Sequence, residues 1–301
     1  MRQLDAVFEG GGVKGIAFAG AVCEFEKRGY SWNRVAGTSA GAIIAALLAA
    51  GYTGVELSEL MKEFQYHRLQ ARQGVSLFFP ILGSWIKLWI QKGFNTGDYL
   101  LNWMDKRLKE KGVHTFADLP ADRLKITASD ITDGRLLVLP DDAGRIGIKP
   151  QSFPVSLAVR MSASLPFYLQ PVIVKNGKRP IYVVDGGLLS NFPLWIFTEN
   201  KTSLYPTIGF RLSAGYEPHP NKVDNFPEYI HAMLRTMMMA HDQRYVEKEH
   251  AVHTVFIPTD GISASKFDLK PEERDQLFAA GETSAVQFLS RLPAMRRTKT
   301  S

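Results

Sequence analysis

The segment Gly37-Thr38-Ser39-Ala40-Gly41 places a serine between two glycines, which is typical of a nucleophile on a sharp turn between a strand and a helix. The context fits, because residues 34–36 read as a short strand and residues 40–50 are apolar nearly all round, as in a buried helix. Glycines beside Ser39 relieve crowding at such a turn, and a helix N-terminus stabilises negative charge there. The alternative is a serine that only caps the helix.

A second cluster, Gly10-Gly11-Gly12-Val13-Lys14-Gly15, also follows a predicted strand and opens a predicted helix. Glycines in this position let backbone amides point at an anion. Gly10, Gly12 and Gly15 satisfy the dinucleotide fingerprint, but that fingerprint needs an acidic residue at the end of the second strand, where this chain reads Val35 to Ser39. The same loop geometry makes an oxyanion hole for acyl transfer. A turn that binds nothing is the third interpretation.

A serine hydroxyl needs a base before it attacks a carbonyl group. None of the seven histidines lies in a glycine-rich turn or directly after a predicted strand. Asp185 is the better partner, because it ends the apolar run 181–184 and is followed by Gly186 and Gly187, which let another part of the chain approach. A free carboxyl group is a weak base at neutral pH, and burial against apolar walls would raise its pKa. The alternative is an ordinary Asp-Gly turn.

Together these motifs resemble the patatin-like phospholipases. The resemblance rests on GGGVKG at 10–15, GTSAG at 37–41, and DGG at 185–187 followed by NFP at 191–193, in the order and contexts of that family. It covers roughly residues 5–195. The segments 160–166 and 127–134 are also similar to family features, whereas the last third of the chain matches less clearly.

The resemblance implies a Ser–Asp catalytic dyad without histidine, in which Ser39 is the nucleophile and Asp185 is the base. It also implies an oxyanion hole formed by the backbone amides of the glycine cluster, those of Gly10, Gly11 and Gly12. Six further motif residues would support these groups: Lys14, Gly15, Gly37, Gly41, Gly186 and Gly187. No metal ion, calcium included, and no cofactor is expected.

Two residues depart from the family's commonest pattern without touching the dyad. Lys14 stands where the family often has arginine, which keeps the charge and loses any bidentate contact, and Gly187 stands where it often has alanine. The family then implies a serine acyl hydrolase that cleaves fatty-acyl esters of phospholipids or lysophospholipids through an acyl-enzyme on Ser39. A general esterase or acyltransferase that uses the same intermediate is one alternative. A catalytically inactive module that binds lipid or a nucleotide is another.

Predicted strands and helices alternate along the chain, which indicates an α/β fold, and the resemblance implies three α/β/α layers around a mostly parallel central sheet. We expect a single catalytic domain over residues 1–301, with the core motifs in 5–195, an insertion or lid candidate at 70–96 and a helical C-terminal part at 224–290. The expected strands are 5–8, 34–36, 124–128, 136–139, 181–184 and 207–212. The expected helices are 13–28, 40–50, 55–65, 96–111, 155–162, 224–249 and 271–290.

Composition limits the kinds of protein that this chain can be. Its 301 residues are 45% hydrophobic and 22% charged, which is typical of a globular domain and excludes disordered, collagen-like and disulfide-rich proteins. The single cysteine, Cys23, allows no internal disulfide and favours a reducing compartment. The net charge of +6 favours anionic surfaces such as phospholipid head groups and is too small to imply nucleic acid.

We expect a cytoplasmic protein whose partners are a lipid substrate and the surface of a membrane, with its oligomeric state left open. No signal peptide is recognised at the N-terminus, and the longest apolar run, 42–50, is far shorter than the ~18 to 20 residues of a spanning helix. The segment 75–94 mixes five aromatic residues with two lysines. That mixture suits a membrane interface, a lid over the site or a packed core helix.

Overall fold

A computed structural model describes residues 2–69, 93–177, 179–199, 204–213, 223–224, 229, 232–233, 236, 253–259, 261–264 and 266–297. Most of the insertion or lid candidate at 70–96, and nearly all of the helix expected at 224–249, lie outside the described residues. None of the helices in the described part is both long and apolar enough to cross a membrane.

The centre of the fold is a sheet of eight described strands in the order β10-β9-β1-β2-β4-β8-β7, with β5 also paired to β4. The pairs from β10 through β4 are all parallel, whereas β5 and β8 run antiparallel to β4, and β7 runs antiparallel to β8. Among the described strands, β5 and β8 alone therefore oppose the common direction, which confirms the mostly parallel sheet. The strands are β1 (Arg2–Phe8), β2 (Tyr30–Gly37), β4 (Leu124–Asp130), β5 (Arg135–Leu139), β7 (Val172–Asn176), β8 (Arg179–Asp185), β9 (Thr207–Ser213) and β10 (Thr254–Pro258).

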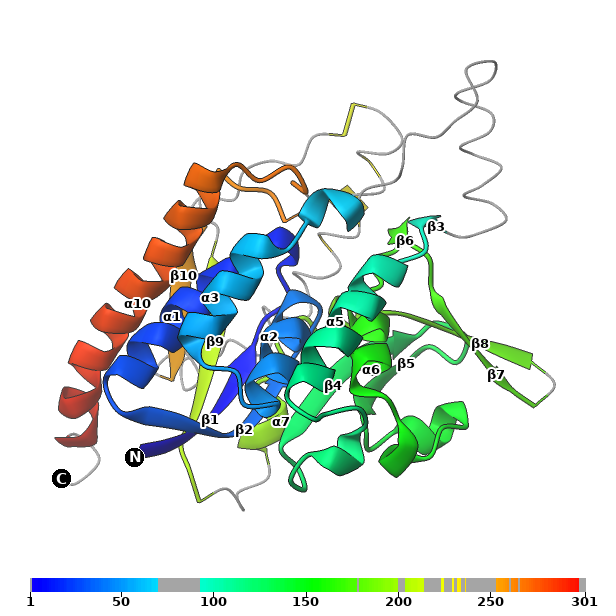
Figure 1. The fold of residues 1–301 in the computed structure, drawn as a ribbon, viewed down its shortest axis with the longest axis horizontal. Coiled ribbons are helices and arrows are strands. Elements are labelled where there is room, and N and C mark those ends of the chain that lie inside the picture. The colour runs from blue at the N-terminus through cyan, green and yellow to red at the C-terminus, as the bar shows by residue number, and fades with distance from the viewer. Residues whose placement is uncertain are drawn as a thin grey trace.

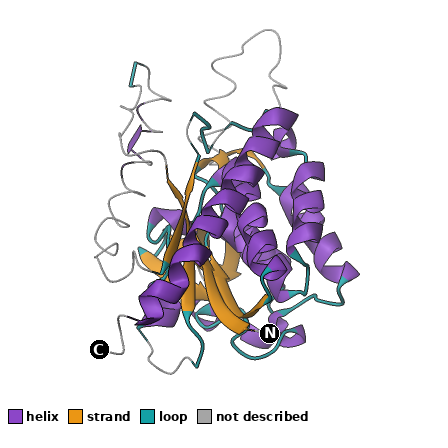
Figure 2. Cartoon of the chain, turned by 90° about the vertical axis from the view of Figure 1, so that its left-hand side faces the viewer, coloured by secondary structure: helices purple, strands orange, loops and turns teal. Residues whose placement is uncertain are grey.

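Helices cover the sheet on both sides (Figure 1, Figure 2). The larger layer contains α1 (Ile16–Lys27), α2 (Ala40–Ala49), α3 (Gly54–Glu63), α5 (Asp98–Glu110), α6 (Val155–Ser162) and α10 (Pro271–Arg297). The short helix α7 (Trp195–Thr198) packs on the other face. A separate two-stranded sheet pairs β3 (Gly93–Asn95) with β6 (Phe167–Leu169).

Alternating side chains in β1 and β2 explain why the sheet is covered on two faces. In β1, Phe8 belongs to the main core, whereas its neighbour Val7 belongs to a smaller core with Phe197 of α7. In β2, Val35 and Ala36 divide between the two cores in the same way. All of these side chains are buried, so both faces exclude water and the expected three-layer α/β/α architecture is confirmed.

The C-terminal helix α10 lies along α1 at the outer side of the molecule (Figure 1). The two helices approach closely through glycines: a Cβ on Gly20 would lie 2.1 Å from the carbonyl oxygen of Phe278, and one on Gly281 would lie 1.9 Å from that of Ala17. Glycine costs a helix interior about 1 kcal/mol, and the tight contact explains its presence here. The helix continues to Arg297, beyond the end expected at 290.

Two strands meet end to end along one edge of β4, and this meeting places the candidate site. Ile126 of β4 pairs with Gly37 of β2 on one edge and with β5 on the other. β5 stays paired to one edge of β4 as far as Asp130. β8 therefore pairs with the edge that β2 has left, where Asp185 lies opposite Ala128. β2 and β8 run in opposite directions, so their last residues arrive on either side of Thr127.

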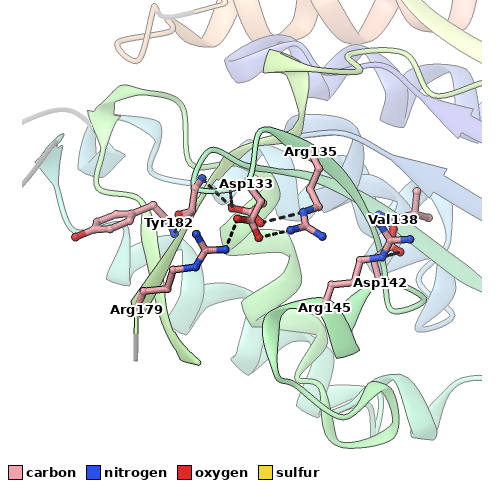
Figure 3. A network of polar contacts seen from close by, with 9 residues as sticks. Asp133, Arg135, Val138, Asp142, Arg145, Arg179 and Tyr182 are labelled. Carbon is pink, nitrogen blue, oxygen red and sulfur yellow. Dashed lines mark hydrogen bonds and ion pairs between the residues drawn. The ribbon is translucent and has the colours of Figure 1, made fainter. Parts of the chain in front are cut away.

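A polar network holds the turn between β4 and β5 against β8 (Figure 3). Oδ1 of Asp130 accepts hydrogen bonds from the amides of residues 132 and 133 at 2.9 and 3.2 Å. The carboxylate of Asp133 forms ion pairs with Arg135 of β5 and with Arg179 of β8. Both antiparallel partners of β4 are therefore tied to one turn, which holds β8 in the register that delivers its last residue to the site.

Candidate active site

Ser39 lies at a strained turn at the end of β2. Its backbone has φ 53° and ψ −117°, a conformation that few non-glycine residues adopt, and its side chain is half-buried. A Cβ on Gly37 would lie 2.3 Å from the carbonyl oxygen of Gly41, and one on Gly41 would lie 2.3 Å from that of Phe8. Gly15 of the glycine cluster also lies close to this turn, since a Cβ there would lie 3.2 Å from that of Ala40, the first residue of α2. The glycines that flank Ser39 are therefore required by backbone contacts.

Asp185 ends β8 with its carboxyl group buried, at 1% exposure. Its Oδ1 accepts a hydrogen bond of 2.8 Å from the amide of Gly187, and the side chain of Ser39 lies close enough to the carboxylate to stabilise its ionised form. Burial raises the pKa of Asp185 to about 6, against the lowering effect of the Gly187 amide and the Ser39 side chain. A carboxyl group with this pKa is ionised at neutral pH and is suited to accept a proton from a neighbouring hydroxyl.

Thr127 fills the space where β2 and β8 meet. Its hydroxyl oxygen lies 2.6 Å from that of Thr38, and the Thr38 hydroxyl donates to the carbonyl oxygen of Ser190 at 3.0 Å. Gly186 packs directly on Thr127, since a Cβ there would lie 2.4 Å from the Thr127 carbonyl oxygen. Both threonine side chains are fully buried. Thr38, which precedes Ser39, and Gly186, which follows Asp185, therefore both pack on the buried Thr127.

The end of α6 contacts the same two residues from the other side. Oγ of Ser162 accepts a hydrogen bond from the amide of Ser39 at 2.8 Å, and the carbonyl oxygen of Ser164 accepts one from the amide of Asp185 at 3.0 Å. These two serines were not among the site residues predicted from the sequence. The one available signal was the likeness of segment 160–166 to a family feature.

The three glycine-loop amides that are expected to act as oxyanion donors differ in their hydrogen bonding. The amide of Gly10 is already used, because it donates to the carbonyl oxygen of Asn191 at 2.9 Å. Within the described part of the chain, the amides of Gly11 and Gly12 have no acceptor, and Gly12 is exposed with φ +57°. The loop lies against the nucleophile turn, since a Cβ on Gly10 would lie 3.5 Å from that of Ser39.

Asn191 joins the loop that follows β8 to the glycine loop. Its Nδ2 donates to the carbonyl oxygen of Gly10 at 3.3 Å and lies 3.5 Å from Oε1 of Glu9. Its Oδ1 occupies the space that a side chain at position 10 would need, 2.2 Å from the Cβ position. Glu9 in turn accepts a hydrogen bond from the amide of Leu212 at 2.6 Å and forms an ion pair with Arg211. The ends of β1 and β9 and the loop after β8 are therefore fixed together.

The other side of the glycine loop is held by the C-terminal part of the chain. Nζ of Lys14 donates to Oγ1 of Thr259 at 3.2 Å, and the amide of Val13 donates to the carbonyl oxygen of Ala264 at 3.0 Å. A Cβ on Gly12 would lie 2.1 Å from that same carbonyl oxygen. Lys14 thus ties the loop to a segment that is about 245 residues away in the sequence.

Three of the seven histidines, His67, His114 and His253, lie in the described part of the chain, and all three are exposed. None of them is among the groups that shift the pKa of Asp185. In the described ranges, no group of three or more His, Cys, Asp or Glu side chains is arranged to hold a metal ion.

Comparison with known proteins gives a family match over most of the chain. The model of the family described as patatin-like phospholipase matches residues 6–198. The chain is 39% identical over 287 residues to the uncharacterized protein YqhO of Bacillus subtilis (strain 168), which covers 95% of this chain and 98% of that protein. It is 29% identical over 201 residues to the uncharacterized NTE family protein Mb2594 of Mycobacterium bovis, which covers 64% of this chain and 27% of that protein.

Two solved structures share the fold. VipD from Legionella pneumophila has a TM-score of 0.58 at 18% identity, over 96% of this chain and 67% of that one. The type III effector protein ExoU has a TM-score of 0.52 at 19% identity, over 97% of this chain and 53% of that one. At these identities the likeness concerns the fold alone, and it agrees with the α/β architecture expected from the sequence.

Proposed function

The chain belongs to the patatin-like phospholipase family, and from this premise we propose that it is a serine acyl hydrolase that cleaves fatty-acyl esters of phospholipids or lysophospholipids. Family membership supports lipid hydrolysis in general. The observation that carries the finer proposal is the placement of Ser39 beside the buried carboxylate of Asp185 and beside the glycine loop with the amides of Gly11 and Gly12.

In the proposed first step, Oγ of Ser39 attacks the carbonyl carbon of the ester while Asp185 accepts the hydroxyl proton. The carbonyl electron pair moves onto the oxygen, and the amides of Gly11 and Gly12 donate hydrogen bonds to the oxyanion. The N-terminus of α2 adds a favourable positive potential. As the ester C–O bond breaks, Asp185 returns the proton to the leaving alcohol oxygen, and the acyl group stays on Ser39.

In the proposed second step, water attacks the acyl-enzyme and Asp185 accepts a proton from it. The tetrahedral intermediate uses the same two amides, the bond to Ser39 Oγ breaks, and the proton returns to that oxygen as the fatty acid leaves. General base catalysis of this kind contributes ~10²- to 10⁴-fold to a rate. Loss of one oxyanion donor typically costs ~10²- to 10³-fold.

Phospholipids are presented as aggregates in water, so we also propose that the protein works at the surface of a membrane. The net charge of +6 supports attraction to anionic head groups. The segment 75–94, which the sequence analysis related to such contact, lies outside the described residues up to position 92.

The test measures fatty acid released from vesicles of phosphatidylcholine and phosphatidylglycerol. We expect Ser39→Ala and Asp185→Asn to lose ~10³-fold or more in rate while keeping the circular dichroism spectrum of the wild type. His67→Ala and His114→Ala are matched controls and keep their activity. A histidine variant as damaging as Ser39→Ala would contradict the dyad. Wild-type protein that hydrolyses only soluble p-nitrophenyl esters would indicate a general esterase, and faster transfer to glycerol than to water would indicate an acyltransferase.

A further inference from the structure

The contacts at the end of α6 point to a role that the proposed mechanism does not yet include. We infer that Ser162 is a positioning residue that holds Ser39 in its strained backbone conformation, and that the same turn holds Asp185 through Ser164. The inference rests on the proposed function, in which Ser39 is the nucleophile and Asp185 is the base.

The first observation is the partner of the Ser39 amide. A non-glycine residue at φ 53° stores ~1–3 kcal/mol of strain, so surrounding contacts must hold it there. The amide of Ser39 donates to Oγ of Ser162 at 2.8 Å, and in the described part of the chain it has no backbone acceptor. Ser162 itself is fully buried, so water does not compete for this hydrogen bond.

This hydrogen bond also decides which amides face the substrate. Because the amide of Ser39 is directed at Ser162, it does not serve the oxyanion, and that task falls to the glycine loop. Removal of the Ser162 oxygen would leave the amide of the half-buried Ser39 without its acceptor, and an unsatisfied donor is unfavourable. The turn would relax to satisfy the amide, and the hydroxyl of Ser39 would move with it.

The second observation is that the next residues of the turn are rigidly held. Arg160 is 4% exposed and donates to the carbonyl oxygens of Thr96 and Gln170 at 2.5 and 2.7 Å, as well as to Oγ of Ser164. The Ser164 hydroxyl donates in turn to the carbonyl oxygen of Arg160 at 2.7 Å. The Ser164 carbonyl oxygen, which accepts the Asp185 amide, is therefore fixed by a buried cation.

Ser162 and Ser164 are two residues apart, and each holds the backbone of one member of the dyad. The position of the attacking oxygen relative to the base therefore depends on a single short segment. A displacement of about 1 Å between reacting groups can cost ~10²-fold in rate. A positioning role thus predicts an effect on the rate of the chemical step, with little effect on substrate binding.

The test compares Ser162→Ala with Ser162→Cys, and uses Ser156→Ala as the control. Ser156 is a buried serine of the same helix, at 4% exposure, with no hydrogen bond to the site. We expect Ser162→Ala to lower kcat ~10- to 100-fold at unchanged KM, and to slow fluorophosphonate labelling of Ser39 by the same factor. Ser162→Cys keeps a weak acceptor of similar size and should fall between Ser162→Ala and wild type. The pH midpoint of kcat/KM should stay at its wild-type value, because Ser162 is not among the groups that shift the pKa of Asp185.

The outcomes separate this inference from the proposed function. Equal activity of Ser162→Ala and Ser156→Ala would overturn the positioning role while leaving the dyad intact, provided that Ser39→Ala is inactive. Equal losses in both variants, with matching falls in Tm, would show a merely structural effect and would also overturn it. If Ser162→Ala does not fold, the Ser162→Cys variant decides the question, and a wild-type kcat in that variant would overturn the positioning role. Activity in Ser39→Ala would instead remove the proposed function itself.

Discussion

The carboxyl group of Asp185 is expected to set the pH dependence of the reaction. A base acts only when it is ionised, and burial raises the pKa of Asp185 to about 6. We therefore predict that kcat/KM falls about tenfold for each pH unit below about pH 6 and is level above it. A pH–rate profile on a soluble ester measures this directly. A profile that stays flat down to pH 4.5 would show that Asp185 is not the base.

The same buried carboxylate should cost stability at neutral pH. Its pKa rises from 3.8 to about 6, so between these values the folded protein binds a proton that the unfolded chain releases, and its contribution to stability falls as pH rises. Above about pH 6 the wild type bears the whole cost, up to about 3 kcal/mol. Asp185→Asn removes the charge and keeps an acceptor oxygen. Its free energy of unfolding at pH 7.5, from urea titration, should therefore exceed that of the wild type.

The comparison at low pH is the control for this prediction. The advantage of Asp185→Asn should shrink toward zero near pH 4, where both proteins are neutral at this position. A variant that is less stable than wild type at pH 7.5, or whose advantage is the same at both pH values, would contradict a buried carboxylate with a raised pKa.

Motif spacing predicted the candidate dyad but not the residues that hold it. Ser39 and Asp185 lie in short patterns with recognisable flanking glycines, and both remain predictions until tested by substitution. Ser162 reaches Ser39 across 123 positions, through a hydroxyl that lies in no such pattern. The use of the Gly10 amide by Asn191 was equally invisible, because it depends on how two loops pack against each other.

Among the elements, helix α6 was expected at residues 155–162 and is found there, whereas four strands were missed. β3 and β6 are three residues long, β7 is an edge strand with exposed side chains, and β10 has an exposed phenylalanine at its centre. Their apolar runs are at most three residues long, shorter than the run of about four to eight that marks a buried strand. The direction of β8 could not be predicted from the sequence either. Asp185 was expected to end a strand of a mostly parallel sheet, yet it reaches Ser39 because β8 enters antiparallel.

The contact between β1 and the nucleophile turn gives a prediction at the scale of elements. A Cβ on Gly41 would lie 2.3 Å from the carbonyl oxygen of Phe8, so Gly41→Ala must push α2 away from β1. We expect a loss of ~1–3 kcal/mol in stability, together with a large loss of kcat. Gly144→Ala is the matched control, since a Cβ there meets nothing within 4 Å, and it should stay within ~0.5 kcal/mol of wild type. Thermal unfolding measures the difference, and equal Tm values for Gly41→Ala and Gly144→Ala would contradict the close contact at Gly41.

Across the whole molecule, the candidate site depends on parts of the chain beyond the family match. The match ends at residue 198, but Thr259 and Ala264 hold the glycine loop, and α10 packs along α1, which that loop opens. These contacts of the last third of the chain could not be predicted from the sequence, because the residues that make them carry no catalytic motif. We therefore expect changes in α10 to affect stability as strongly as changes near the site.

The glycines between α1 and α10 test this dependence. Gly20→Ala and Gly281→Ala each insert a methyl group where backbone lies within about 2 Å, so each should lower stability by ~1–3 kcal/mol or more. Since either change already separates the same two helices, the double variant should lose less than the two single losses combined. Ala279→Ser, on the exposed side of α10, is the control. Strictly additive losses in urea titrations would show that the two glycines do not share one interface.

The central claim is that the hydroxyl of Ser39 is the nucleophile and is activated by Asp185, and covalent labelling tests it most directly. The wild type is treated with a fluorophosphonate, and the modified peptide is identified by mass spectrometry. We predict a single adduct on the peptide that contains Ser39, absent in Ser39→Ala and formed far more slowly in Asp185→Asn. An adduct on another residue, or labelling at an unchanged rate in Asp185→Asn, would contradict the account.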